Sequence, residues 1–183
     1  GFVNAALEVR DQIEAGSMPT PERIICPVGS SATLAGLTLG CTLAGLPTQV
    51  DGVRVAPSHL GPFPACTPET VGKLMQHTEN FLRRHLKSEL PRVPRPVLRD
   101  EYFGEGYGQS TTEGQQAISR FGEHGFKLEP TYTGKAAAAF LDTLDETEGP
   151  VLFWHTWNSR DTTGLAQAAD PDQLPGALRS LFD

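Results

Sequence analysis

The chain has 183 residues, of which 38% are hydrophobic and 20% are charged, and its formal net charge is −7. This length suits one globular domain, and no apolar run is long enough to span a membrane. The negative charge disfavours nucleic acid and anionic membranes as partners, because both attract basic surfaces. We therefore expect neither among its partners.

The cysteines and histidines show no ligand or disulfide spacing. Cys26 and Cys41 stand in apolar surroundings, and Cys66 completes an odd number without paired spacing. This usage predicts reduced core thiols and a cytoplasmic location. The histidines have no ligand spacing with a carboxylate or a cysteine, so we expect no metal site.

The first part of the chain alternates helical and strand-like segments. Apolar residues at helical spacing predict a helix over residues 2–13, and the branched run Arg23–Val28 predicts a buried strand. A turn led by glycine, residues 29–33, enters a helix that we expect over 32–46. Residues 49–56 alternate apolar and polar side chains, which is typical of a strand.

The middle of the chain begins with a proline-rich stretch, residues 59–66, which we interpret as a long loop. Thr67 is the expected N-cap of the next helix, because Pro68 follows at the first helical position and an apolar stripe continues to about residue 86. Residues 97–103 are the expected third strand.

The last part contains three further helices and one strand by the same criteria. Ser110 and Glu113 form a capping-box pattern before one helix, and another is expected to begin near Thr133. Residues 150–156 predict the last strand. A weaker closing helix is indicated by apolar residues at helical spacing, namely Leu174, Leu178 and Leu181.

This order predicts a single α/β domain over residues 1–183, with a layered, mainly parallel twisted sheet flanked by helices. Ligands of such sheets bind at the carboxyl ends of the strands. Three segments follow expected strands and are therefore candidates for a site: residues 29–33, residues 104–112, and the segment from His155 onward.

The turn at residues 29–33 has the layout of an anion-binding cradle. A helix's first turn offers unpaired N–H groups and the positive end of its dipole, and Ser30, Ser31 and Thr33 add hydroxyl groups. The spacing matches neither a Walker A loop nor a dinucleotide fingerprint. An ordinary serine-rich N-cap is the alternative interpretation.

Other candidate residues have structural interpretations beside functional ones. Tyr107 stands in a glycine-rich turn that would leave its phenol exposed, and Tyr132 precedes a helix; either tyrosine could instead simply pack against the surface. Thr133 could be only an N-cap, and Lys135 an exposed residue of the first helical turn. His155 is more typical of a core histidine with its hydrogen bonds satisfied than of a pocket residue.

Five segments, taken in order, resemble one enzyme family. They are "GFVNAALE", "VGSSATLAG", "GYGQSTTEG", "EPTYTGKA" and "VLFWHT". Together they resemble the carboxyl-terminal half of the pyridoxal-phosphate enzymes that group D-cysteine desulfhydrase with 1-aminocyclopropane-1-carboxylate (ACC) deaminase. The resemblance implies the large domain of a fold type II, tryptophan synthase beta-like enzyme, with pyridoxal 5′-phosphate as cofactor.

The resemblance also implies roles for matching residues. It assigns the cofactor phosphate to Gly29, Ser30, Ser31, Ala32 and Thr33. It places Thr133 opposite the pyridine nitrogen, and it makes Tyr107 and Tyr132 the two catalytic-pocket tyrosines beside the substrate.

Thr133 also bears on the type of reaction. The desulfhydrases resemble "YTGK" and the deaminases "YEGK". A neutral hydroxyl does not stabilise a protonated pyridine nitrogen as a carboxylate does, so electron withdrawal into the ring is weaker. We therefore expect β-elimination from a small amino acid, yielding a keto acid and ammonia.

The chain departs from the family pattern at four positions. Ser31 and Ala32 replace glycines, and Trp157 and Asn158 replace a glycine pair beside the ring.

The largest departure is that no lysine stands in a context matching the Schiff-base lysine. We therefore expect a large-domain fragment, inactive alone, whose partners are the remaining amino-terminal part and a second copy in a homodimer. ACC deaminase-like ring opening and a non-catalytic phosphate-binding or interaction module are the alternatives.

Overall fold

The computed structural model describes the chain except residues 87–89, 159, 162, 165–169, 174 and 180–183. The main helices are α1 (Phe2–Glu14), α2 (Ala32–Leu43), α3 (Pro68–His85), α4 (Thr112–Glu123) and α5 (Thr133–Glu146). The strands are β1 (Arg23–Val28), β2 (Gln49–Arg54), β3 (His59–Leu60), β4 (Phe63–Pro64), β5 (Val97–Arg99) and β6 (Val151–Phe153). Two short elements follow, the 3₁₀ helix η1 (Pro171–Gln173) and α7 (Gly176–Arg179).

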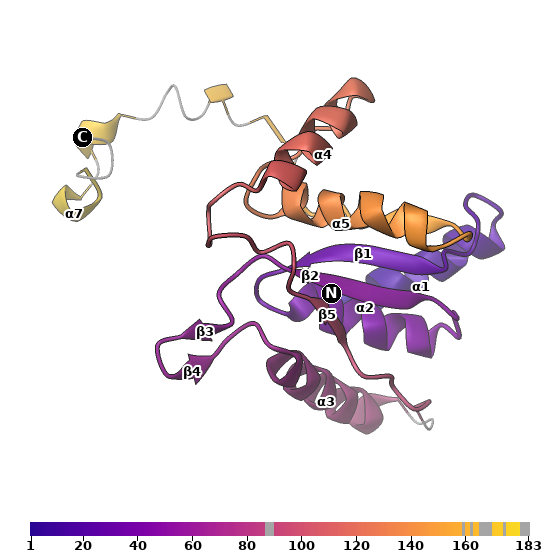
Figure 1. Ribbon diagram of the computed structural model, residues 1–183. Helices are drawn as coiled ribbons and strands as arrows, with labels where there is room; N and C mark the ends of the chain where they lie inside the picture. The colour runs from indigo at the N-terminus through magenta and orange to yellow at the C-terminus, as the bar shows by residue number, and fades with distance from the viewer. Residues whose placement is uncertain (87–89, 159, 162, 165–169, 174, 180–183) are drawn as a thin grey trace.

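A four-stranded parallel sheet in the order β5-β2-β1-β6 forms the centre of the molecule (Figure 1). In its register Cys26 pairs with Gly52 on one side of β1, and Ile25 pairs with Phe153 on the other. Parallel strands covered on both faces are expected to be continuous apolar runs, as β1 is. The predicted α/β fold with a parallel sheet is confirmed.

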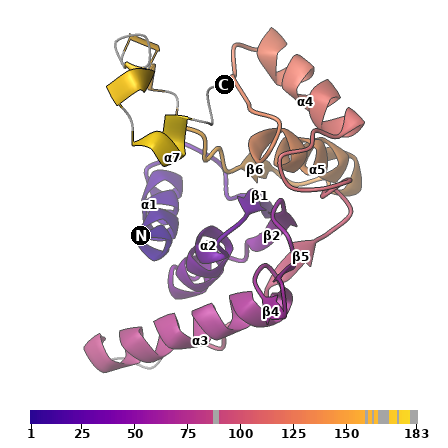
Figure 2. The ribbon, with the colours of Figure 1, turned by 90° about the vertical axis from the view of Figure 1, so that its left-hand side faces the viewer.

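One face of the sheet is covered by α1, α2 and α3 (Figure 2). Ile24, Cys26 and Val28 point to this side and pack with the apolar residues of α2. Helices α1 and α2 approach closely because Gly36 and Gly40 have no side chain: an added Cβ would lie 2.6 Å from Phe2 Cβ and 2.5 Å from Ala6 Cβ, respectively. The opening helix is therefore an integral part of the core.

The other face is covered by α5, on which α4 packs. Ile25 and Val53 meet Ala136 and Ala139, whose small side chains let α5 lie close to the sheet. The contact between α4 and α5 is equally close at Gly134, where an added Cβ would stand 2.8 Å from the side chain of Ile118. This packing fixes α5 beside the carboxyl ends of the strands.

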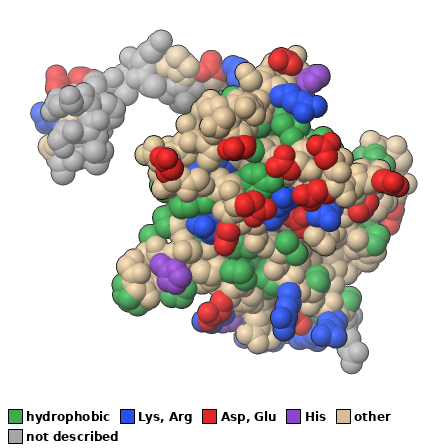
Figure 3. All heavy atoms as spheres, in the orientation of Figure 1, with side chains coloured by type: hydrophobic (Ala, Val, Ile, Leu, Met, Phe, Trp, Pro, Cys, Tyr) green, Lys and Arg blue, Asp and Glu red, His purple; other side chains and the backbone are tan. Residues whose placement is uncertain are grey.

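Several element boundaries differ from the expectations. Helix α2 ends at Leu43, before Gly45 in a left-handed conformation, and β5 and β6 are three-residue strands. The expected loop at residues 59–66 contains an antiparallel hairpin, β3–β4, that exposes Leu60 and Phe63. In Figure 3 hydrophobic and histidine side chains gather over this hairpin.

The helix caps confirm one expectation and correct another. Thr67 caps α3, since its side chain accepts a hydrogen bond from the N–H of Thr70. The cap of α4 is Thr111 rather than Ser110, because Thr111 has extended backbone angles and its Oγ1 accepts from the N–H of Gly114 at 3.0 Å.

The closing helix is smaller than expected within the described residues. Leu178 lies in α7, whereas Leu174 and Leu181 lie outside the described residues.

The three cysteines are free and buried, which confirms Cys26 and Cys41 as core residues. Acidic and basic side chains alternate on the face shown in Figure 3. Arg54 and Asp100 form an ion pair of 2.6 Å. Among the described helices, none is long and apolar enough to cross a membrane. The described residues also contain no cluster of three or more histidine, cysteine or carboxylate side chains suited to a metal ion.

Candidate functional site

A cavity of about 500 Å³ lies at the carboxyl end of β1. Five of the residues predicted from the sequence line it, namely Gly29, Ser30, Thr33, Tyr107 and Tyr132. They come from the turn between β1 and α2, from the turn before α4 and from the start of α5. The fold thus brings together segments that are far apart in the chain.

The amino terminus of α2 opens toward this cavity without a cap of its own. Ser31, the N-cap residue, makes no side-chain hydrogen bond to the helix, and the first turn contains no acidic residue. The N–H groups of that turn therefore lack a side-chain acceptor, and the positive end of the helix dipole is not neutralised locally.

Ser31 has two further unusual properties. Its φ of 69° is left-handed, a conformation that glycine adopts more readily than serine. Its side chain is only 4% exposed, and its Oγ has no hydrogen-bond partner. A buried hydroxyl without a partner is costly, and an anion at the helix terminus would supply the missing acceptor. Ser31 and Ala32 do not line the cavity themselves, but they form the turn behind it.

The amino terminus of α5, in contrast, is satisfied by the chain itself. The carboxylate of Glu129 accepts hydrogen bonds from the backbone N–H groups of Thr131, Tyr132 and Thr133, at 2.8, 2.7 and 2.6 Å. Negative charge at a helix amino terminus is stabilising, so Glu129 acts as the cap. Thr133 is thus the first helical residue and not the N-cap, which is Tyr132.

The hydroxyl of Thr133 also contacts Glu129. Its Oγ1 accepts from the N–H of Glu129 at 2.8 Å and lies 3.2 Å from a carboxylate oxygen of the same residue. Thr133 is 1% exposed, yet it lines a second cavity of about 430 Å³ together with Glu129, Trp157 and Asn158. Both cavities are lined by Tyr132 and Thr156, so they are adjacent and we treat them together as the candidate site.

Tyr107 and Tyr132 meet through their hydroxyl groups, which form a short hydrogen bond. Their rings pack edge to face with centroids 6.0 Å apart. Tyr107 is 52% exposed, which confirms the predicted accessible phenol. The hydrogen bond with Tyr107, followed by burial, raises the pKa of Tyr132 to about 12. Tyr132 therefore keeps its proton at neutral pH and can donate a hydrogen bond but cannot act as a base.

The structure corrects the interpretations of Lys135 and His155. Lys135 is fully buried, not exposed, and its ammonium donates to the carbonyl oxygens of Phe103 and Gly106 at 2.6 and 3.0 Å. His155 is exposed rather than part of the core, and its Nε2 pairs with the carbonyl oxygen of Lys127 at 3.0 Å. Neither the helical position of Lys135 nor the position of His155 after β6 revealed these environments.

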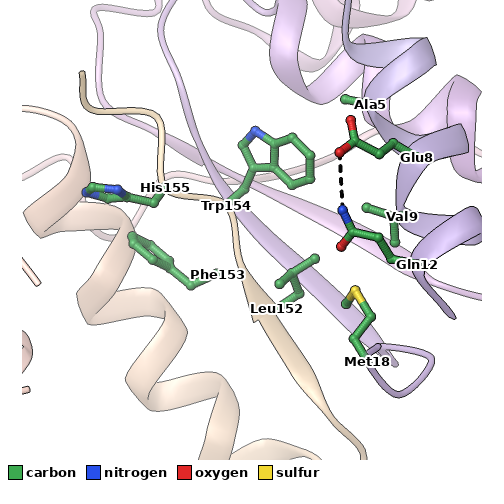
Figure 4. A pocket seen from close by; sticks show the side chains of 9 residues that line it. All are labelled: Ala5, Glu8, Val9, Gln12, Met18, Leu152, Phe153, Trp154 and His155. Carbon is green, nitrogen blue, oxygen red and sulfur yellow. Dashed lines mark hydrogen bonds between the residues drawn. The ribbon is translucent and has the colours of Figure 1, made fainter. Parts of the chain in front are cut away.

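Two further cavities are lined by none of the residues predicted to bind the cofactor or the substrate, although His155 lines both. One, of about 410 Å³, runs between α1 and β6, where Leu152 and Trp154 point toward α1 while Phe153 and His155 point away (Figure 4). The other, of about 450 Å³, is lined mainly by aromatic and leucine side chains of α4 and α5. Neither cavity is lined by a residue of the turn at 29–33.

The sequence interpretation missed the roles of Glu129 and Thr156. Glu129 precedes the helix by four residues, and an acidic residue shortly before a helix is a signal for a cap, although Pro130 and Thr131 intervene. Thr156 follows the end of β6 closely, at the sheet edge where ligands of parallel sheets bind.

Comparisons with known proteins point to one family. A family model described as "Pyridoxal-phosphate dependent enzyme" matches residues 1–156. The chain is 32% identical over 161 residues to a D-cysteine desulfhydrase of Klebsiella pneumoniae subsp. pneumoniae. It is 33% identical over 161 residues to the D-cysteine desulfhydrase of Klebsiella pneumoniae strain 342. Each match covers 85% of this chain and 45% of the relative, so the chain spans about half the length of these proteins.

Solved structures show the same fold. An ACC deaminase homologue superposes with a TM-score of 0.68 and 26% identity, over 90% of this chain and 48% of that structure. A threonine deaminase from T.th. superposes with a TM-score of 0.56 and 19% identity, over 88% of this chain and 56% of that structure.

Proposed function

The chain belongs to the family of pyridoxal-phosphate-dependent enzymes, and we propose that it forms the cofactor-binding part of a lyase that acts on a small amino acid by β-elimination. The resemblance to D-cysteine desulfhydrases, at 32% and 33% identity, supports this reaction class. Because those relatives are about twice as long, the activity belongs to a whole protein of which this chain is one part.

The open amino terminus of α2 is the observation that carries the proposal. Its first turn has no capping side chain or acidic residue, and the buried Oγ of Ser31 has no partner. A phosphate group has oxygen atoms that can accept from several N–H and O–H donors at once, so the residues present fit it. We assign the phosphate to Gly29, Ser30, Ser31, Ala32 and Thr33.

Thr133 is the proposed partner of the pyridine nitrogen. When bound, pyridoxal phosphate withdraws electrons from the α-carbon of an amino acid. Thr133 brings a neutral hydroxyl to the lining of the second cavity, and that hydroxyl is itself oriented by Glu129. Weaker withdrawal favours loss of a group from the β-carbon, as we expected from the sequence. The similarity to an ACC deaminase homologue keeps ring opening as the alternative.

Tyr107 and Tyr132 are the proposed catalytic pair beside the substrate. Both line the larger cavity, and their hydroxyl groups share one hydrogen bond. Since Tyr132 retains its proton at neutral pH, the pair can donate a hydrogen bond to a substrate oxygen or leaving group while holding the remaining proton between them.

The proposal also includes features of the whole enzyme that lie outside this chain. The lysine that holds the cofactor covalently would come from the part of the protein outside this chain, as the family resemblance implies. A homodimer, which the same resemblance implies, and a cytoplasmic location, which the cysteine usage predicts, remain predictions. The homodimer would be tested by measuring the molar mass of the natural protein in solution by light scattering.

A cofactor-binding experiment tests the phosphate site without requiring catalysis. Pyridoxal 5′-phosphate, pyridoxal and inorganic phosphate would each be titrated into the full chain, with binding followed by ³¹P NMR and calorimetry. We expect pyridoxal to bind at least about tenfold more weakly than pyridoxal 5′-phosphate, because it lacks the charged group that the helix terminus binds. Equal affinity for the two would contradict the assignment.

The reaction class is tested on the natural full-length protein. A β-elimination enzyme would release sulfide, ammonia and a keto acid in equal amounts from D-cysteine. An ACC deaminase-like enzyme would release ammonia and a keto acid from ACC and no sulfide from D-cysteine. Binding of pyridoxal phosphate with turnover of neither amino acid would favour the non-catalytic module.

A further inference from the structure

Lys135 is buried to an extent that is rare for lysine. Its exposed fraction is 0%, and a lysine side chain is seldom fully buried unless its charge is paired. The partners of its ammonium are two backbone carbonyl oxygens, those of Phe103 at 2.6 Å and Gly106 at 3.0 Å. The ring of Phe103 lies 5.1 Å from the same nitrogen. A positive charge placed in this way binds backbone dipoles rather than a carboxylate.

Both carbonyl groups belong to the glycine-rich turn that leads from β5 to α4. Gly104 and Gly108 have left-handed φ angles of 70° and 76°, which makes the turn intrinsically adaptable. Within its own backbone, the N–H of Phe103 donates to the carbonyl oxygen of Asp100 at 3.1 Å, and the N–H of Gln109 donates to that of Gly106 at 3.3 Å. Contacts with α5 are therefore important for holding the turn in one conformation.

A second cation holds the start of the same turn. The guanidinium of Arg54, at the end of β2, lies 4.2 Å from the centre of the Phe103 ring and pairs with Asp100 at 2.6 Å. Arg54 also binds the carbonyl oxygen of Ala56. The turn is thus attached to the sheet through Arg54 and to α5 through Lys135.

Tyr107 follows directly after the carbonyl group that Lys135 binds. About half of its surface is exposed, and the contacts that hold its ring and hydroxyl are those with Tyr132. Tyr132 stands three residues before Lys135 at the start of α5. One end of one helix therefore fixes the backbone of the turn and also receives its phenol.

We propose that Lys135 is a positioning residue, whose ammonium fixes the turn at residues 103–107 so that the hydroxyl of Tyr107 meets that of Tyr132 in the candidate site. The importance of this positioning for catalysis rests on the proposed function. The positioning itself requires no cofactor and is tested separately.

Hydrogen exchange of backbone amides gives the first test. The full chain with Lys135→Met keeps the apolar stem of the side chain but loses the charge and both hydrogen bonds. We expect amides of residues 103–108 to exchange at least about tenfold faster, with those of β1 and α2 unchanged. Lys127→Met, at an exposed lysine, is the matched control and should leave the turn as it is. Unchanged exchange in the turn of Lys135→Met would overturn the proposal.

The ionisation of Tyr132 gives a second test that general destabilisation does not imitate. With ¹³Cζ-labelled tyrosine, NMR would follow the phenol in Tyr107→Phe, Lys135→Met and the double variant. We expect both single variants to lower the pKa of Tyr132 from about 12, because each breaks the hydrogen bond with Tyr107. The double variant should lower it no further than Tyr107→Phe alone. Independent, additive shifts would contradict positioning by Lys135.

The unaltered chain and a conservative variant cover the case in which Lys135→Met fails to fold. In the unaltered chain, ¹⁵N NMR should show a slowly exchanging ammonium whose protons lie near those of the turn, and a rapidly exchanging ammonium would refute the contact. Lys135→Arg keeps the positive charge and the hydrogen-bond donors. The backbone amides of its turn should therefore exchange more slowly than those of a folded neutral variant such as Lys135→Gln.

The proposed function can fail independently of this proposal. If the chain does not bind pyridoxal 5′-phosphate but Lys135→Met loosens the turn, the positioning holds and the cofactor assignment is wrong. If the natural enzyme is active and its Lys135→Met variant keeps the Tyr107–Tyr132 hydrogen bond, the assignment holds and the positioning is wrong.

Discussion

The amino termini of α2 and α5 lie beside the same two adjacent cavities, and their N–H groups are satisfied in opposite ways. At α5 the carboxylate of Glu129 accepts from three backbone N–H groups. At α2 the N-cap Ser31 leaves its hydroxyl without a partner, and no acidic residue follows in the first turn. One helix carries its own anion, whereas the other leaves the place of an anion open.

The two helix termini therefore have different roles: that of α5 holds residues of the site in place, and that of α2 is proposed to bind a ligand. The capped terminus of α5 holds Tyr132 and Thr133 in fixed positions, because Glu129 binds the N–H groups of both. The open terminus of α2 is stabilised when an external anion arrives, since the same N–H groups and dipole can then be satisfied. Three substitutions at these two termini and the pH dependence of Tyr132 test the distinction.

Removing the internal anion should have the largest effect. Glu129→Ala leaves the N–H groups of Thr131, Tyr132 and Thr133 without their acceptor, so we expect the free energy of unfolding to fall by about 2–4 kcal/mol. Urea denaturation followed by circular dichroism would measure it. Glu123→Ala, at the exposed end of α4, is the control and should change stability by less than about 0.5 kcal/mol. An equally small effect for Glu129→Ala would show that the cap is unimportant.

A carboxylate added at the amino terminus of α2 should prevent a phosphate group from binding there. Ser30 is exposed and lines the larger cavity, so Ser30→Asp places a carboxylate where the phosphate is proposed to bind. We expect affinity for pyridoxal 5′-phosphate to fall by about tenfold to one hundredfold, through repulsion and competition for the helix terminus. Calorimetry would measure it. Ser17→Asp adds the same charge at an exposed turn and should bind like the unaltered chain.

Ser31→Gly should make the open terminus more stable but less suited to an anion. Glycine removes the left-handed strain and the buried hydroxyl without a partner, which together outweigh its greater freedom in the unfolded chain. We expect the free energy of unfolding to rise by about 1 kcal/mol while phosphate affinity decreases. Thermal denaturation with and without the cofactor would reveal both effects. A loss of stability would mean that the Ser31 hydroxyl is satisfied in solution.

The pH dependence of Tyr132, the N-cap residue of α5, should give the smallest effect. Its pKa in the folded chain is about 12, against an ordinary value of 10.0, so the protonated phenol is favoured by folding. That contribution is fully present below pH 10.0 and is lost as the pH rises toward 12. Tyr107→Phe should narrow this pH range, since the hydrogen bond with Tyr107 is the main cause of the raised pKa of Tyr132. Denaturant unfolding across this pH range would detect the change.

The sequence predicted the elements around the site better than it predicted their contacts. The strand Arg23–Val28 has its expected bounds, and the helix at Ala32 and the helix at Thr133 begin where expected. These elements are specified by local apolar periodicity and by turn residues, which act over a few positions. Strand ends were less accurate, because the length of β5 and β6 depends on pairing with neighbouring strands.

The unexpected environments of Lys135, Thr133 and His155 share one cause. A pattern along one helix or strand does not reveal which distant segment covers a given side chain. Lys135 is buried because the turn at residues 103–106 lies over its ammonium, and the hydroxyl of Thr133 is occupied because Glu129 folds back onto it. His155 is exposed although it follows a strand of apolar residues, and it binds a carbonyl oxygen from a separate loop.

By itself, therefore, the sequence determined the α/β order of elements, the glycine-led turn before α2 and the family to which the chain belongs, because these depend on local patterns and on short motifs in a fixed order. The tertiary structure decided that α5 is capped by Glu129 while the amino terminus of α2 has no capping side chain. From the same structure we propose that Lys135 fixes the turn that bears Tyr107. These features depend on contacts between segments separated along the chain by up to several tens of residues, and such contacts are chosen by packing in three dimensions.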